Sequence, residues 1–157
     1  MCNNTLLGQR LNLTSSIDIF DNLIKKNEWE TLIRLFSLNI LDINHRDCKG
    51  RNILYFAILN KKYEYIKILF DLRVNSRVNF SLNAINFAVC LDDIKSLEIL
   101  LKCGLSVDTL DEIGTSPLIY AILYNKKKST EFLIKSGADL ELEDFMGNCA
   151  KFLLHSK

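Results

Sequence analysis

The sequence predicts an all-α protein made of stacked helix-turn-helix units, and three features support this fold class. The motif Asp-x-x-Gly begins at Asp111 and again 33 residues later at Asp144. A fixed period of that length is typical of solenoids whose units stack side by side. Glycines separate the segments, and apolar residues recur between them at three- and four-residue spacing, which places them on one helical face. Each hairpin is too small to bury that face alone, so stacking is expected to form the core.

Earlier copies of the unit can be followed upstream through one repeated alanine. Ala121, Ala88 and Ala57 hold the same place in successive copies, at intervals of 33 and 31 residues. The shorter interval predicts that two residues are missing from the connection around residues 74–78. The single proline, Pro117, suits the first turn of a helix, where its missing N–H costs no hydrogen bond.

These motifs resemble the ankyrin repeat, most clearly between Asp111 and Asp144 and more weakly upstream. The resemblance implies an ankyrin-repeat solenoid with short β-turn fingers and terminal caps. We predict an N-terminal extension (1–13), an N-terminal capping repeat (14–46), a repeat (47–77), a divergent repeat (78–110), a further repeat (111–143) and a partial C-terminal capping repeat (144–157).

The copy at 78–110 departs most from the family pattern. Ser81 stands where the opening glycine is expected, and Ala84 stands where the next copy has Pro117. The usual threonine at the helix start is replaced by Asn52, Asn83 and Ser116. Asn and Ser can still cap a helix start, so the hairpins are expected to survive. Whether these residues keep the hydrogen bonds between adjacent fingers stays open.

Composition indicates one ordinary domain of 157 residues, 48% hydrophobic and 25% charged. The formal net charge of +1 argues against a nucleic-acid partner, since that affinity needs dense positive charge. No apolar run reaches the length of a membrane helix, and no secretory signal opens the chain, so a cytoplasmic protein is expected. The run Lys126-Lys127-Lys128 is expected in a solvated loop between helices.

No arrangement of residues suggests catalysis, a cofactor or a metal. The five cysteines form no C-x-x-C pair, and an odd count without zinc-type spacing suits free thiols in a reducing compartment. His45 and His155 are the only histidines, and neither lies in a nucleophile or metal-ligand pattern. The acidic residues 139–144 lack the glycine-turned loop of a calcium site. We therefore expect a protein that is not an enzyme and that acts by binding.

The resemblance implies that a partner meets the concave surface, formed by residues after each opening Asp and by the exposed end of each first helix. At these places the sequence has an apolar strip with charged residues at its ends, and exposed apolar and aromatic surface marks interaction sites. In the alternative, a slight rotation of the helices turns the helix residues inward, into the core. The predicted partner-binding residues are Lys49, Arg51, Phe80, Leu82, Leu91, Glu112, Ile113, Leu123, Tyr124, Phe145 and Met146.

Three classes of function follow, of which the enzyme is the least supported. The leading hypothesis is a monomeric module that binds one protein through its concave face, as a stoichiometric inhibitor or immunity-type protein of a toxin or enzyme. The second is an adaptor that bridges two proteins in an assembly. The partner's identity is not encoded in the fold, because this fold serves many partners.

Overall fold

The computed structural model describes the backbone of residues 13–155 and the side chains of residues 19–155. Among these residues the only pairings of β type are two isolated bridges, Arg77 with Asn83 and Glu143 with Cys149. The predicted all-α architecture is confirmed. Residues 1–12 of the predicted N-terminal extension lie outside the described residues. The helices are α1 (Leu13–Lys25), α2 (Trp29–Ser37), α3 (Ile53–Leu59), α4 (Tyr63–Asp71), α5 (Ala84–Cys90), α6 (Ile94–Lys102), α7 (Pro117–Leu123), α8 (Lys127–Lys135) and α9 (Ala150–His155).

The chain divides into two compact units after Asp42. In the first unit, α1 packs on α2, and Phe20 and Leu32 are fully buried. The capping repeat expected at 14–46 would comprise this helix pair. The exact repeat boundaries remain a prediction.

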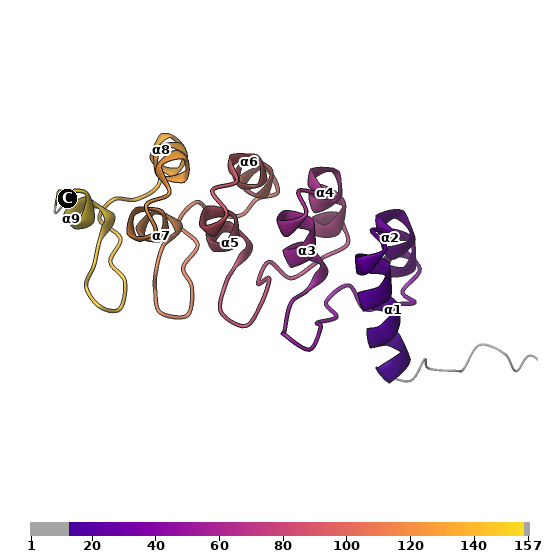
Figure 1. Cartoon of the computed structure of the whole chain (residues 1–157). Helices are drawn as coiled ribbons and strands as arrows, with labels where there is room; N and C mark the ends of the chain where they lie inside the picture. The colour runs from indigo at the N-terminus through magenta and orange to yellow at the C-terminus, as the bar shows by residue number, and fades with distance from the viewer. Residues whose placement is uncertain (1–12, 156–157) are drawn as a thin grey trace, which may run out of the picture. The chain divides into compact units, whose positions relative to one another are not determined.

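The second unit stacks the remaining helices in two rows (Figure 1). The first helix of each pair, α3, α5, α7 and α9, contacts its counterpart in the next pair, and the second helices α4, α6 and α8 do the same. A loop precedes each first helix and projects from the side opposite the second helices (Figure 1). We call these loops fingers.

Short polar side chains start the first helices as the sequence predicts. The side chains of Asn52, Asn83 and Ser116 accept hydrogen bonds from the backbone N–H three residues ahead. Such caps satisfy N–H groups that have no partner inside the helix. Pro117 takes the first helical position of α7, also as predicted.

The Asp-x-x-Gly motif works by folding each finger turn around a carboxylate. Asp47 Oδ1 accepts the N–H groups of Lys49 and Arg51, both at 2.9 Å, and the Asp47 carbonyl accepts the N–H of Gly50. Gly50 has φ of +73°, a region that costs a residue with a Cβ atom. The turns at Asp111 and Asp144 repeat this hydrogen-bond pattern, with Gly114 and Gly147 also at positive φ.

The divergent finger keeps the backbone hydrogen bond that closes this turn, without the carboxylate and without a residue at positive φ at Ser81. The N–H of Val78 donates to the Leu82 carbonyl, where the N–H of Asp47 donates to the Arg51 carbonyl in the previous finger. Val78 is fully buried, and Asn79 supplies the side-chain acceptor one residue later. The connection before α5 spans residues 72–83, two fewer than 103–116 or 136–149, so the predicted shortening is confirmed.

Asparagine caps also join neighbouring fingers, which resolves the question left open by the sequence. Asn52 Nδ2 donates to the carbonyls of Asn75 and Arg77 at 2.9 and 3.2 Å. Asn83 Nδ2 donates to the Thr109 carbonyl at 3.4 Å. The bond at the divergent helix is the longest of the three, so this joint is held less tightly.

The core of the second unit follows the apolar stripes, with one exception. Ile66, Leu69, Leu97 and Leu100 are fully buried, as their spacing predicts, and Phe70 and Leu101 of the same predicted stripes are half-buried. Asn86 is also fully buried in α5, yet neither polar atom of its amide has a hydrogen-bond partner. A buried amide without partners costs about 1–3 kcal/mol.

Candidate functional site

The predicted apolar strip is exposed at the finger tips. Phe80, Ile113, Phe145 and Met146 expose 67%, 57%, 78% and 82% of their surface, and we call these four residues the finger-tip patch. Leu82, predicted in the same strip, is half-buried. Exposed aromatic and large aliphatic side chains gathered on one side of a protein are typical of docking surfaces.

Two rings of this patch pack against the glycines of the preceding finger. A Cβ atom at Gly50 would collide with the Phe80 ring, and one at Gly114 would collide with the Phe145 ring. The N–H of Phe145 also donates to the Ile113 carbonyl at 3.2 Å. The glycines therefore serve both the turn and the aromatic contact between fingers, because the missing Cβ atom leaves room for each ring.

The charged residues at the ends of the strip differ in whether they already form an ion pair within the protein. Lys49 is exposed, but the Arg51 guanidinium pairs with Asp47 and lies over the Tyr55 and Phe56 rings, 5.3 and 4.8 Å from their centroids. Glu112 pairs with Arg77 at 2.6 Å on the surface. Lys49 is thus the better candidate for a rim charge, because Arg51 already neutralises a buried carboxylate.

Hydrogen bonding sets the pKa of that carboxylate. Burial would raise the pKa of Asp47, but the bonds from the Arg51 side chain and from two backbone N–H groups outweigh it and lower the pKa. The pKa of Asp144 is lowered chiefly by the hydrogen bonds from Asn148. Both groups are therefore held as anions at neutral pH, where they keep the finger turns closed.

A second row, mostly apolar, runs along the ends of the first helices. It comprises the last residue of each helix and the residue after it: Leu59 with Asn60, Cys90 with Leu91, and Leu123 with Tyr124. Leu59 and Leu91 are each 41% exposed, and Leu123 and Tyr124 are 57% and 58% exposed. The alternative in which these leucines pack inward is therefore not observed. We call this row the helix-end ladder.

The most exposed pair of the ladder, Leu123 with Tyr124, contacts a side chain that is itself hydrogen-bonded. The Tyr124 ring stacks on the Tyr120 ring with centroids 5.6 Å apart, and the Tyr120 hydroxyl donates to Asp111 Oδ2 at 2.8 Å. Burial and this carboxylate raise the pKa of Tyr120, so its hydroxyl remains a donor. Tyr124 is therefore both exposed and oriented.

The lysine run was predicted in a loop, and this prediction is wrong. Lys126 precedes α8, and Lys127 and Lys128 form its first turn. Cations are unfavourable at a helix N-terminus, so local preference argues against this placement. Asp92 compensates from the adjacent repeat, because its Oδ1 accepts both the N–H and the hydroxyl of Ser129, at 2.9 and 2.7 Å.

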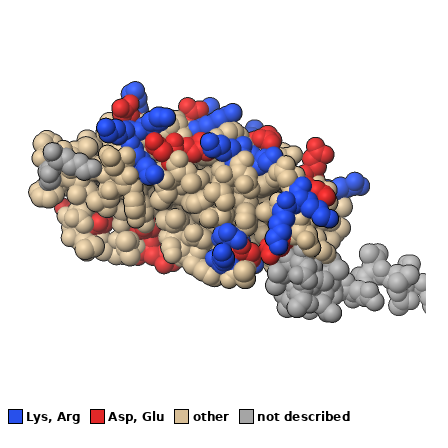
Figure 2. Space-filling view, viewed as in Figure 1, with Lys and Arg blue, Asp and Glu red and all other residues tan. Residues whose placement is uncertain are grey.

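A groove of 840 Å³ lies between α4 and α6, on the row of second helices. Tyr63, Phe70 and Ile99 supply apolar walls, and the charged residues that line it include Lys67 and Lys102 as well as Glu64 and Asp71. Arg73 and Val74, from the shortened connection, also line it. Figure 2 shows charged side chains gathered along the second helices, while the surface facing the viewer over the first helices is mostly uncharged.

The described residues hold no group of three or more His, Cys, Asp or Glu side chains placed to bind a metal ion. Cys48, Cys90, Cys103 and Cys149 are free thiols, and Cys2 lies outside the described residues. Burial raises the pKa of the Cys90 and Cys103 thiols, which reduces the thiolate fraction at neutral pH.

Comparison with protein families agrees with this geometry. Residues 71–144 match the family model described as ankyrin repeats, with three copies. This chain therefore contains ankyrin repeats. Ankyrin repeats are protein–protein interaction modules, so the exposed patches are considered below as surfaces for a protein partner.

A search of characterised proteins finds similarity to the potassium channel AKT2/3 of Arabidopsis thaliana. The two sequences are 28% identical over 127 residues, which cover 76% of this chain and 16% of the channel. The chain thus corresponds to a small part of that relative. In the described part of this chain, no helix combines the length and apolar composition required to cross a bilayer.

Two features of the surface were missed by sequence reasoning. The groove between α4 and α6 has one sequence signal, the 31-residue interval, since residues of the shortened connection line it. Arg46 donates to the carbonyls of Gly50 and Arg77, at 2.6 and 2.8 Å, and so ties two fingers together. No local pattern indicates this bond, because its second acceptor lies 31 residues away.

Proposed function

We propose that this ankyrin-repeat protein binds one protein partner through its concave face, formed by the finger-tip patch and the helix-end ladder. The observation that carries the proposal is the finger-tip patch itself. Its four side chains are largely exposed, and two of its rings pack against glycines of the preceding finger, which reduces the side-chain freedom that a partner would have to remove. Aromatic anchors of this kind carry much of the energy of protein interfaces.

The finer role we propose is stoichiometric inhibition, in which the module covers a functional surface of a toxin or enzyme. The module would act as a monomer in the cytoplasm, without a nucleic-acid partner and without catalysis. The free thiols at the described cysteines are compatible with a reducing compartment. Size-exclusion chromatography with light scattering tests the monomer, and a dimer at micromolar concentration would contradict it.

The test of the binding face compares variants that leave the fold intact. Ile113→Ser and Met146→Ser remove exposed apolar anchors, whereas Glu98→Ala changes an exposed residue of α6. Each anchor variant should weaken binding of the partner captured from the source cells by about tenfold to a hundredfold. Titration calorimetry measures the affinity, and thermal unfolding verifies that the variants stay folded. Unchanged binding by both anchor variants, with loss at Glu98→Ala, would place the partner on the second helices.

An adaptor that bridges two proteins is the second candidate, favoured by the groove between α4 and α6. The charged groups at its edge take part in none of the ion pairs found among the described residues. A second partner on this groove would leave the finger-tip patch free. Lys67→Glu together with Lys102→Glu would then abolish the second interaction and leave the first unchanged, and a ternary complex would form in native mass spectrometry. A captured partner whose own activity is blocked, without a ternary complex, favours inhibition.

A further inference from the structure

We propose that the helix-end ladder binds an acidic amphipathic α-helix of the partner, with its large apolar residues two helical turns apart, laid across α3, α5 and α7. This inference rests on the proposed function and names the kind of partner segment that one part of the concave face fits. Three observations carry it: the spacing of the rungs, the placement of lysines beside them, and the engagement of the acidic residues between them.

The rungs of the ladder repeat once per ankyrin unit. They stand at the ends of α3, α5 and α7, and these helices pack directly against one another in that order. Packed helices lie about 8–10 Å apart, and two turns of an α-helix advance about 11 Å. A helix laid across the three ends would therefore bring an apolar residue over each rung if such residues recur every seven positions. An extended strand advances about 3.3 Å per residue and would match every third residue, so its side chains would alternate faces.

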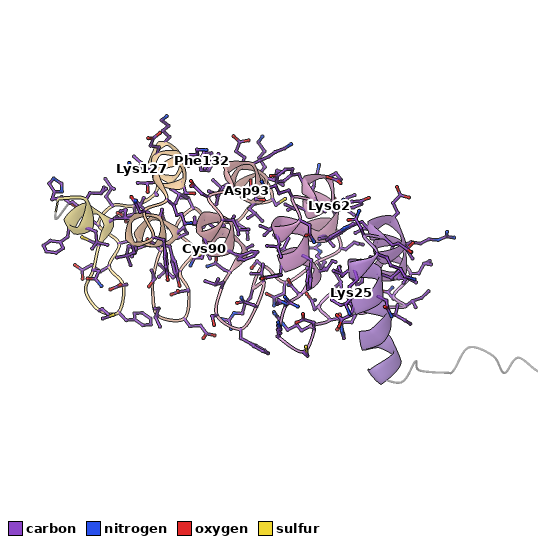
Figure 3. All side chains as sticks on the ribbon, viewed as in Figure 1. Lys25, Lys62, Cys90, Asp93, Lys127 and Phe132 are labelled. Atoms are coloured by element: carbon purple, nitrogen blue, oxygen red, sulfur yellow. The ribbon has the colours of Figure 1, made fainter. Side chains whose placement is uncertain are left out.

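Lysines flank both ends of the ladder. Lys61 and Lys62 follow the first rung, and Lys126, Lys127 and Lys128 follow the last. Figure 3 shows Lys62, Asp93 and Lys127 in one row at the starts of α4, α6 and α8, above Cys90 of the middle rung. None of the ion pairs among the described residues uses these five lysines. They are therefore available to an anionic ligand.

The acidic residues of the same row already have partners within the protein. Asp92 accepts the N–H and hydroxyl of Ser129, as described above. Asp93 accepts the hydroxyls of Tyr63 and Ser96, at 3.1 and 2.8 Å for the nearest oxygens. These two carboxylates keep their charge, but they are turned toward partners within the fold and are outnumbered by the five lysines, so the net charge along the ladder is positive. Glutamates between the leucines of a docked helix would meet it.

The placement of the lysine run also supports this assignment. Three lysines at the start of α8 are a local cost to that helix, and the fold offsets it by capping α8 through Asp92. A ligand that brings carboxylates to this end would replace repulsion with attraction. The ladder and the run together fit an acidic helix better than a basic or neutral one.

The experiment uses the full chain and three synthetic peptides of 21 residues that are stapled to hold the helix. The first has leucine at every seventh position and glutamate at most others. The second has the same composition with leucines spaced five residues apart, which scatters them around the helix. The third keeps the leucine spacing and replaces glutamate by lysine. Titration followed by ¹H–¹⁵N correlation spectra measures affinity and maps the contacted residues.

The first peptide should bind at least tenfold more tightly than either control and should shift the amides of the ladder. Leu91→Ser and Tyr124→Ser should each weaken it about tenfold, and Lys127→Glu with Lys128→Glu should remove most of the salt dependence of its affinity. Equal binding of the first two peptides, preference for the lysine peptide, or shifts confined to other surfaces would overturn the inference.

The outcome separates this inference from the proposed function. If the captured partner loses affinity with Ile113→Ser and Met146→Ser but not with the ladder variants, the concave face still binds protein and the acidic-helix assignment fails. If neither set of variants affects the partner, both proposals fail. A partner that binds through an extended segment, seen as strand-like shifts in its own spectra on complex formation, also overturns the assignment.

Discussion

The repeat at 111–143 and the divergent repeat at 78–110 form the same helix pair from different local chemistry. The first closes its finger with Asp111 and Gly114 and has Ile119 buried in its first helix. The second has Val78 and Ser81 at the corresponding turn positions, and Asn86 takes the place of the buried isoleucine. Neighbouring units therefore impose the backbone of the divergent repeat, while its own residues stabilise it less. In a solenoid this is expected, because stability includes interface terms with each neighbour.

The largest effect should come from exchanging the buried residues of the two repeats. Ile119→Asn loses a fully buried aliphatic side chain and gains an amide without partners, which should lower the free energy of unfolding by about 3–5 kcal/mol. Asn86→Ile should raise it by about 1–3 kcal/mol, because an unpaired amide is removed. Urea unfolding measures both variants. If Asn86→Ile is less stable than the parent protein, the space around residue 86 fits the amide better than the isoleucine side chain.

The side-chain acceptors of the two finger turns should contribute different amounts to the free energy of unfolding. Asp111→Ala removes bonds to two backbone N–H groups and to the Tyr120 hydroxyl, and should cost about 2–3 kcal/mol. Asn79→Ala removes a neutral acceptor of two N–H groups and should cost about 1 kcal/mol. Equal losses in chemical unfolding would show that the carboxylate adds nothing to the regular turn.

Substitutions at the fourth position of each turn, Gly114 and Ser81, should also change the free energy of unfolding by different amounts, with a smaller difference. Gly114→Ala introduces a Cβ atom at φ of +73°, against the Phe145 ring, and should cost about 1–2 kcal/mol. Ser81 has no such backbone conformation, so Ser81→Ala should change stability by about 0.5 kcal/mol or less. Thermal unfolding of the pair, with a crystal structure of Gly114→Ala, would test this. An unchanged Phe145 ring and melting temperature would contradict it.

The smallest difference between the two kinds of turn should be their response to acid. It should be absent at neutral pH, where the aspartates of the regular turns are ionised. The folded pKa values of Asp47 and Asp144 are lowered, so their contribution is complete above the unfolded value of 3.8 and is lost as pH falls below it toward the folded pKa. Asp144→Asn should reduce the fall in unfolding free energy between pH 5 and 3. The control is Asn79→Ala, which removes a neutral side chain and should leave the pH dependence of the unfolding free energy unchanged. If Asp144→Asn also leaves that pH dependence unchanged, the acid sensitivity of the protein comes from other groups.

Sequence reasoning predicted the features that depend on residues close together in the chain. The caps at Asn52, Asn83 and Ser116 and the turn glycines each act within five residues, so their identity and spacing are enough to indicate the structure. The 31-residue interval likewise located the shortened connection, because the helices on either side keep their register. The family resemblance extended these local predictions to a stack of helix pairs.

The tertiary structure decided what depends on contacts between repeats. Arg51 was predicted to face a partner but pairs with Asp47 and two aromatic rings, and the lysine run starts a helix because Asp92 caps it from the adjacent repeat. The exposure of Leu91 and Tyr124, left open by helical periodicity, also depends on how adjacent helices rotate. Sequence alone determined the repeating unit and its turns, since those follow from short-range hydrogen bonding and backbone conformation. Which side chains remain free for a partner was decided by packing between units, whose contacts lie some thirty residues apart in the chain.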